Sequence, residues 1–266
     1  MRDVSRKIWI GLPLGSLLFC VAVAVISPDL YKAYIRRHEV GALEHGTVIC
    51  LVPAVAFGVM AWAGRRKLPT PWLAGWSLLI TLGALYFGGE ECSWGQNYIH
   101  WATPEGWSRL NDQHETNLHN TSGLFDQLPR DLLSAAAIFC VVTSVAIRSR
   151  RQQWNPATNA WSWLLPTPAV FVAALIAVLS GLPQKFYHEY HTVSAAIPAW
   201  FDQMFLRGHH SEFKEYFLAM FILMYQWSWV SRLRSMKASE QQLADRGPAE
   251  RNETESAATP ARNQAA

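Results

Sequence analysis

The sequence predicts an all-α fold: a polytopic transmembrane helical bundle of about six spans, with short interfacial helices in its outer loops. Lys, Arg, Asp and Glu make up only 16% of the 266 residues, whereas soluble domains contain roughly a quarter. These charges gather between long uncharged stretches that show no strand-like alternation. Because backbone groups in hydrocarbon must pair internally, the stretches are predicted to be helices rather than barrel strands.

Six apolar segments account for the predicted spans. Residues 8–26 form the first, an uncharged run of 19 residues, close to the roughly 20 that a span requires. A cleaved signal peptide is the alternative for this run, but Ser27-Pro28-Asp29 lacks a clear cleavage site, so we interpret the run as a span. The last segment is long enough only if residues 212–215 begin the same helix. The predicted spans lie near residues 8–27, 46–64, 70–89, 131–147, 163–182 and 213–231.

Two short helices are expected in the outer loops. Thr103 and Pro104 have the form of a helix start, which predicts a helix from 104 to about 111 along the membrane. Residues 197–206 are expected to lie there too, with their apolar side chains facing lipid: Trp200, Phe201, Met204 and Phe205. Several of the 13 Trp residues fall near predicted span ends, where aromatic side chains are enriched.

The chain divides into a transmembrane helical domain, residues 1–237, and a tail, residues 238–266. The tail lacks apolar periodicity and is expected to be disordered. The four Cys residues, Cys20, Cys50, Cys92 and Cys140, lie within or at the ends of apolar runs and have no metal-binding spacing. They are predicted to be small apolar packing residues rather than a disulfide framework.

The basic residues predict which side of the membrane each loop faces. With the N-terminus in the cytoplasm, the short inner segments hold twelve Lys and Arg residues: 2, 6, 7, 65–67, 148, 150, 151, 232, 234 and 237. The much longer outer loops hold eight: 32, 36, 37, 109, 130, 185, 207 and 214. The positive-inside rule therefore favours both termini inside.

In this orientation the acidic and His-rich segments lie at the outer ends of the spans. A helix over 115–119 would place Glu115 and His119 on one face, and the pairs His188/His191 and Glu212/Glu215 are also spaced for a shared face. Side chains at these spacings can converge on one divalent metal ion. The alternative is that they are solvated interfacial groups, or that they pair with Arg109, Arg130, Arg207 or Lys214.

Two strings carry a family resemblance, Glu90-Glu91-Cys92-Ser93-Trp94-Gly95-Gln96 and Glu115-Thr116-Asn117-Leu118-His119-Asn120. They resemble a family of uncharacterised bacterial multi-pass inner-membrane proteins. The resemblance extends to Glu39-x-Gly41-x-x-Glu44 and, more weakly, to Glu212-x-x-Glu215, although Asn97 stands where relatives often have Arg. It implies a location in the bacterial inner (cytoplasmic) membrane and transfers no reaction.

A vaguer likeness is to the intramembrane proteases that process prenylated proteins. Those enzymes also pair two adjacent Glu residues with later His residues, a pattern that Glu90-Glu91, His119 and His188 would fit. The Arg expected shortly after the Glu pair is absent here, so the likeness is only an analogy.

Whether the chain is an enzyme stays open at this point, and the sharpest hypothesis is a metal-dependent, hydrolase-like membrane enzyme. Its site would lie at the outer leaflet and act on a lipid or lipid-linked substrate. Glu90 or Glu91 would act as general base on a metal-bound water. Zinc or iron would be bound by Glu115, His119 and Glu215 with His188 or His191, beside a further polar cluster of Glu44, Gln96, Asn117 and Glu212.

Two other functional classes were weighed against the enzyme. A non-catalytic membrane scaffold or assembly protein is the main alternative. A proton-coupled transporter is disfavoured because the sequence shows no internal repeat and no charge in the middle of a span. Membrane lipid is the expected partner, whereas nucleic acid is not, because the basic residues flank spans and form no aromatic-interleaved face.

Overall fold

The computed structural model describes residues 3–35, 41–109, 115–118, 121–146, 155–183, 197–206 and 210–245. Helices dominate these ranges, and no strand occurs within them, which confirms the all-α prediction for this part of the chain. Five segments are long and apolar enough to cross a membrane: Arg6–Ile26, Ala42–Ala63, Trp72–Glu91, Gln127–Ala146 and Trp161–Ser180. The chain is therefore a multi-pass membrane protein, and six remains the predicted number of spans.

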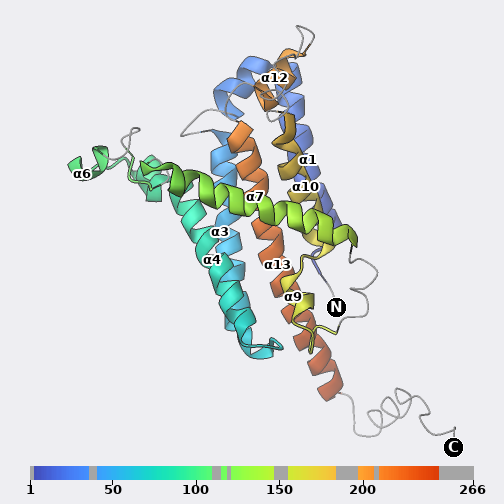
Figure 1. The fold of residues 1–266 in the computed structure, drawn as a ribbon. Helices are drawn as coiled ribbons and strands as arrows, with labels where there is room; N and C mark the ends of the chain where they lie inside the picture. Colours follow the sequence, from blue (N-terminus) through green and yellow to red (C-terminus); the bar gives the residue numbers. More distant parts are fainter. Residues whose placement is uncertain are drawn as a thin grey trace, which may run out of the picture.

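The first three long helices form an up-down-up arrangement (Figure 1). Helix α1 (Arg6–Ile26) leads through the short α2 (Pro28–Leu30) and a π-helical turn (Tyr31–Ile35) toward α3 (Ala42–Ala63). A 3₁₀ turn at Arg65–Lys67 then reverses the chain into α4 (Trp72–Glu91). Helices α3 and α4 pack along each other, so α3 begins and α4 ends at the same end of the bundle.

The centre of the bundle is α13 (His210–Asp245), a helix of 36 residues. It packs against α3, α10, α7, α4, α1 and α12. Most of its side chains between residues 212 and 233 are buried, including Phe217, Met224 and Trp229. The predicted span at 213–231 lies within α13. The polar residues Lys214, Glu215, Gln226 and Arg232 make α13 less apolar than the five segments above.

The segment predicted as one helix over 163–182 is interrupted. Helix α9 (Trp161–Leu164) ends at Leu165, which has an extended backbone. A 3₁₀ turn (Pro168–Val170) then leads into α10 (Phe171–Ser180). Pro166 and Pro168 explain the break, because proline lacks the amide hydrogen of a helical residue and biases the preceding residue away from helix.

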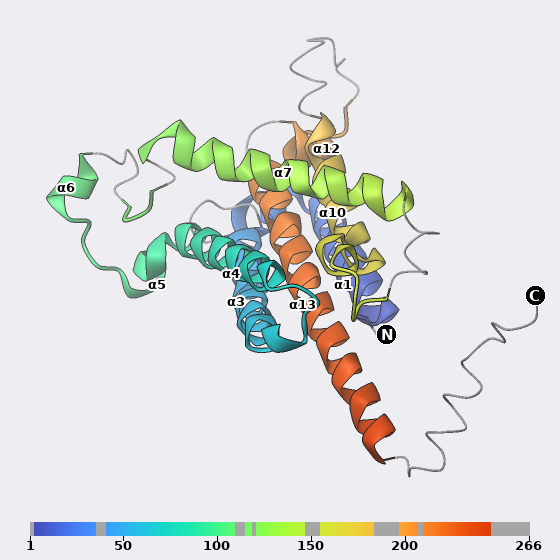
Figure 2. The same cartoon turned by 60° about the horizontal axis from the view of Figure 1, so that its bottom comes forward.

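Helix α7 (Gly123–Ala146) runs across the other long helices rather than alongside them (Figures 1 and 2). It begins well before residue 131, where the predicted span begins, and it packs mainly against α10 and also against α13. Its first turns lie on the side of α4's C-terminal end (Figure 2). The charged residues at the start of α7 are thereby brought to that end of the bundle.

Short helices occur at both positions where the sequence predicts them, α6 (Glu105–Ser108) and α12 (Ala199–Phe205), and their location in outer loops stays a prediction. The expectation that the apolar side chains of α12 face lipid is wrong for Met204, which is buried. Phe205 lies edge-on to Phe213, with ring centroids 5.7 Å apart. Helix α12 therefore packs onto α1 and α13.

The four cysteines are free thiols, and Cys20, Cys50 and Cys140 are buried, in agreement with the packing role predicted for them. Helix α13 continues through Asp245, past residue 237, where the transmembrane domain was expected to end. Residues from 246 onward lie outside the described ranges, so the disordered tail stays a prediction.

Candidate functional site

The candidate carboxylates that the structure describes gather at one end of the bundle. Glu44 lies in the first turn of α3, Glu90 and Glu91 close α4, and Glu212 and Glu215 lie in the first two turns of α13. Figure 1 shows why they meet: α3 and α13 begin, and α4 ends, at the same end. Within this end the side chains divide into two networks.

The first network begins at Glu90, which is 4% exposed. The indole N–H of Trp94 donates to its Oε1 at 2.7 Å, and the backbone N–H of Leu118 donates to its Oε2 at 2.6 Å. One carboxylate oxygen therefore holds Trp94, and the other attaches residue 118 to the end of α4.

Glu115 and Asn117 extend this network. The Ser93 hydroxyl donates to Glu115 Oε2 at 2.7 Å. The buried Asn117 amide donates to Ser93 Oγ at 3.1 Å and also to Glu115 Oε2. The carboxylate of Glu115 is thus engaged by two neighbours from within the protein.

Gln96 connects the same two segments through its side-chain amide. Its Nε2 donates to Trp101 O at 3.1 Å and to Thr103 Oγ1 at 2.8 Å. Its Oε1 accepts from the backbone N–H of Thr116 at 2.7 Å and from the Thr116 hydroxyl at 2.9 Å. We call these contacts between residues 90–96 and 115–118 the clasp.

The clasp encloses a strained turn. Ser93, Trp94 and Gly95 have φ values of 47°, 56° and 105°, in the left-handed region that non-glycine residues enter at a cost. The backbone conformation directs the chain away from the axis of α4, and the hydrogen bonds of Ser93 and Trp94 offset its cost. The clasp residues Glu90, Gln96, Glu115 and Asn117 therefore have a structural use.

The second network surrounds Glu91, which is half-buried. Glu91 interacts electrostatically with Glu215, Glu44 and Glu212, and with Arg130 of α7. We call Glu44, Glu91, Glu212 and Glu215 the carboxylate cluster. Glu212 and Glu215 are each 4% exposed, so part of the cluster lies inside the bundle.

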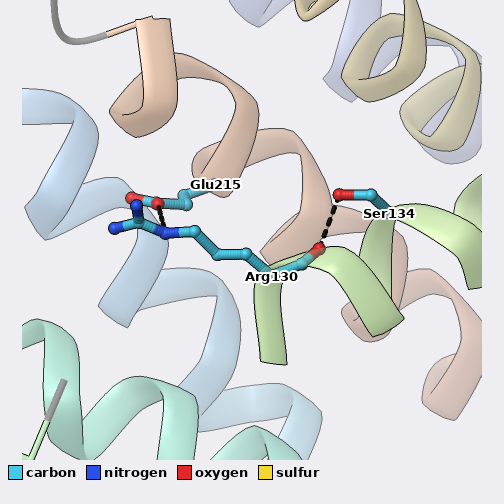
Figure 3. A network of polar contacts seen from close by, with 3 residues as sticks. All are labelled: Arg130, Ser134 and Glu215. Carbon is cyan, nitrogen blue, oxygen red and sulfur yellow. Dashed lines mark hydrogen bonds and ion pairs between the residues drawn. The ribbon is translucent and has the colours of Figure 1, made fainter. Parts of the chain in front are cut away.

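Arg130 contacts the cluster directly. Its Nε lies 2.5 Å from Glu215 Oε1, and the Arg130 side chain is 39% exposed whereas that of Glu215 is 5% exposed. Figure 3 shows the guanidinium reaching from α7 to the carboxylate on α13, while the Arg130 carbonyl accepts from Ser134 Oγ at 2.5 Å. Like charges this close repel, so a cluster of this kind is favourable only with positive charges or protons among them, and Arg130 supplies one such charge.

A pocket of about 310 Å³ opens beside the cluster and shares Glu215 with it, and the ion-pair partner Arg130 lines it as well. It is lined by residues of α7 and α13, namely Gln127, Arg130, Asp131, Ser211, Lys214, Glu215 and Leu218. A small molecule in this pocket would lie next to the carboxylates.

His45, which directly follows Glu44 in α3, contacts Tyr98. His45 Nδ1 lies 3.2 Å from the Tyr98 hydroxyl, and the two rings stack with centroids 5.7 Å apart. Burial raises the pKa of the Tyr98 hydroxyl, and the charges of Cys92 and Glu44 raise it further. The hydroxyl therefore remains protonated beside Glu44 at neutral pH.

The metal ligands predicted from the sequence are only partly within the described residues. Glu115 lies in the clasp and Glu215 in the carboxylate cluster, so these two belong to different networks. His119, His188 and His191 lie outside the described ranges. Among the residues that are described, no group of three or more His, Cys, Asp or Glu side chains is arranged to hold a metal ion.

Sequence reasoning did not assign roles to Ser93, Thr116 or Tyr98, although Ser93 and Thr116 stand inside the two strings that carry the family resemblance. Their position inside these strings was the sequence signal that could have identified them. No such signal marked Tyr98, because its contact with His45 joins two segments that are far apart in the sequence.

No protein-family model, no curated protein and no solved structure matches this chain. The resemblance to uncharacterised bacterial inner-membrane proteins therefore stays a prediction, and a function has to be inferred from the site itself.

Proposed function

We propose that this chain is a membrane-embedded, hydrolase-like enzyme that binds a divalent metal ion at the carboxylate cluster and acts on a lipid or lipid-linked substrate. One observation carries the proposal: Glu44, Glu212 and Glu215 act electrostatically on Glu91 at one end of a bundle of membrane-length helices, and Glu215 also lines an open pocket. The proposed setting is the bacterial inner membrane, with both termini cytoplasmic and the cluster at the outer leaflet.

The two networks suggest different roles for the adjacent Glu residues. Glu90 uses both oxygens to hold Trp94 and Leu118, so proton transfer at Glu90 would disrupt the clasp. Glu91 belongs to the cluster instead, and we assign it the role of general base. A divalent metal ion would take carboxylate oxygens from Glu44, Glu212 and Glu215 and would lower the pKa of a coordinated water. As these described side chains stand they are not arranged to hold an ion, so binding requires a further ligand or a shift of the carboxylates.

The donor set bears on which ion is bound. Carboxylate oxygens alone suit hard cations such as magnesium or manganese, whereas zinc or iron is favoured when imidazole joins them. The predicted zinc or iron site therefore depends on His119, His188 or His191 completing the cluster.

The first test is metal analysis of detergent-purified protein. We expect a stoichiometric divalent metal in the parent protein and loss of most of it in Glu44→Gln and Glu212→Gln. Glu105→Gln is the matched control, because Glu105 is exposed on α6 and lies outside the cluster. Since a ligand that binds only the folded state stabilises it, EDTA should lower the melting temperature of the parent and of the control but not of the two cluster variants.

A non-catalytic scaffold or assembly protein is the second candidate, and the Arg130–Glu215 ion pair favours it, because this pair joins α7 to α13 and could have a purely structural role. On this alternative the purified protein contains no stoichiometric metal and is insensitive to EDTA, while Glu215→Gln still lowers the melting temperature. That combination of results would overturn the enzyme proposal.

A further inference from the structure

The pocket between α7 and α13 combines charges of both signs. Arg130 and Lys214 are cationic, and Asp131 and Glu215 are anionic. Leu218 adds an apolar contact, and Gln127 and Ser211 are neutral hydrogen-bonding groups. The volume, about 310 Å³, is at the lower end of the range of small-molecule sites, roughly 300 to 1,000 Å³.

The first turns of α7 give this pocket exposed apolar neighbours. Gln127, Arg130 and Asp131 are spaced three and four residues apart and line the pocket together. Leu124, Leu128 and Leu132 follow one another at intervals of four and are 64%, 48% and 63% exposed. Exposed leucines are the side chains that contact acyl chains in a membrane protein, so we infer that the pocket opens beside lipid.

The two cations suit a phosphate group. Arg130 contacts Glu215 through Nε, and a guanidinium has five N–H donors in a fixed fork, so one arginine can serve a carboxylate and a phosphate together. Lys214 is half-buried on α13 and adds a compact positive charge. A phosphate held here would lie between α7 and α13.

The two carboxylates suit an ammonium group in the same ligand. Asp131 is exposed at the rim and Glu215 is buried. A purely anionic head group would meet these carboxylates as like charges, which is unfavourable at short range. A primary ammonium has three N–H donors for them, whereas a quaternary ammonium has none.

We propose that this pocket binds the head group of a phospholipid that carries both a phosphate and a primary ammonium group, as phosphatidylethanolamine does. The acyl chains would leave the pocket along the exposed leucines of α7. That such a lipid is also the substrate rests on the proposed enzymatic function, whereas its binding does not.

The test measures lipid binding to the purified full chain by native mass spectrometry, with EDTA present. Phosphatidylethanolamine, phosphatidylcholine and phosphatidylglycerol with identical acyl chains are compared, together with soluble glycerophosphoethanolamine. We expect phosphatidylethanolamine to bind about tenfold more tightly than the other lipids, the size expected from losing one charge-assisted hydrogen bond. The soluble head group should bind more weakly still, because it lacks acyl chains.

Substitutions of pocket residues test whether the lipid binds in this pocket. Lys214→Gln and Asp131→Asn should each weaken phosphatidylethanolamine binding about tenfold. Lys237→Gln is the matched control: Lys237 is exposed, lies on the same helix at its opposite end, and its loss should leave affinity unchanged. The comparison of lipids needs only the parent protein, so it stands even if a variant does not fold.

Equal affinity for phosphatidylethanolamine and phosphatidylcholine would overturn the proposal, and so would a Lys214→Gln variant that folds and binds normally. Tight binding of glycerophosphoethanolamine would show a soluble ligand and would likewise overturn it. Because EDTA is present throughout, failure of metal binding leaves this result intact, and the two proposals can fail separately.

Discussion

Glu90 and Glu91 are neighbours in the sequence, yet they have different surroundings. Successive helical residues point about 100° apart, so the two side chains at the end of α4 face different neighbours. Glu90 holds Trp94 and Leu118, and Glu91 faces Glu44, Glu212, Glu215 and Arg130. Glu90 therefore belongs to the clasp, and Glu91 belongs to the carboxylate cluster.

We predict that Glu90→Ala loosens the clasp, whereas Glu91→Ala does not. The substitution leaves the partly buried Leu118 amide without its charged acceptor, which costs roughly 1 to 3 kcal/mol. Hydrogen–deuterium exchange of a peptide covering residues 115–118 should accelerate in Glu90→Ala and remain as in the parent in Glu91→Ala. Unchanged exchange in a folded Glu90→Ala protein would contradict the role given to the clasp.

The sequence singled out several residues of the two networks, but it did not show how these residues are arranged. The strings around Glu90 and Glu115 singled out residues that do contact one another, such as Gln96 with Thr116. Their division into two networks was not predictable, because it depends on the left-handed turn at Ser93 and Trp94. Arg130 was one of four possible cationic partners, and only the oblique course of α7 brings it to Glu215 (Figure 3).

At the scale of helices, the close packing of α3, α4 and α13 depends on Gly58. A Cβ at this position would lie 2.0 Å from Thr81 Oγ1 and 3.0 Å from Gln226 Nε2. The buried Gln226 amide in turn donates to Thr81 Oγ1 at 3.3 Å. A small residue on one helix thus lets two polar side chains of its neighbours meet inside the bundle, as is common in membrane helix packing.

We predict that Gly58→Ala destabilises the bundle by roughly 1 to 3 kcal/mol, the usual cost of overpacking a tight core. Gly83→Ala is the control, because nothing lies within 4 Å of a Cβ added there and alanine favours helix. Thermal unfolding in detergent, followed by tryptophan fluorescence, should show a lower melting temperature only for Gly58→Ala. Equal melting temperatures of the Gly58→Ala and Gly83→Ala proteins would contradict this prediction, because they would show that the helices can move apart at position 58 with little loss of stability.

Hydropathy predicted where most of the long helices lie along the chain, but not how they are arranged. The uncharged runs near residues 8, 46 and 70 match α1, α3 and α4 to within a few residues. The crossing direction of α7 escaped prediction because tilt depends on packing against neighbouring helices rather than on the number of apolar residues. The break before α10 was foreseeable from Pro166 and Pro168, since proline interrupts the helical hydrogen-bond pattern.

At the scale of the whole molecule, the two ends of the bundle differ in charge. The carboxylate cluster lies at one end. At the other, α1 begins at Arg6, the turn Arg65–Lys67 joins α3 to α4, and the second half of α13 carries Arg232 and Arg234 (Figure 1). Arg232 is part of the core there: it donates to Ser162 O at 2.5 Å and lies 4.7 Å above the Trp163 ring.

This polarity leads to a prediction about orientation. Basic residues near span ends are retained in the cytoplasm, so reporter fusions after Arg66 and after Arg150 should read as cytoplasmic, and a fusion after Asn120 should read as periplasmic. Replacing residues 65–67 by neutral Gln should increase the inverted fraction, whereas replacing Lys32, which lies in the expected outer loop, should not. If all three fusions read the opposite way, the carboxylate cluster and its pocket face the cytoplasmic leaflet, and the substrate must then be sought among lipids of that leaflet.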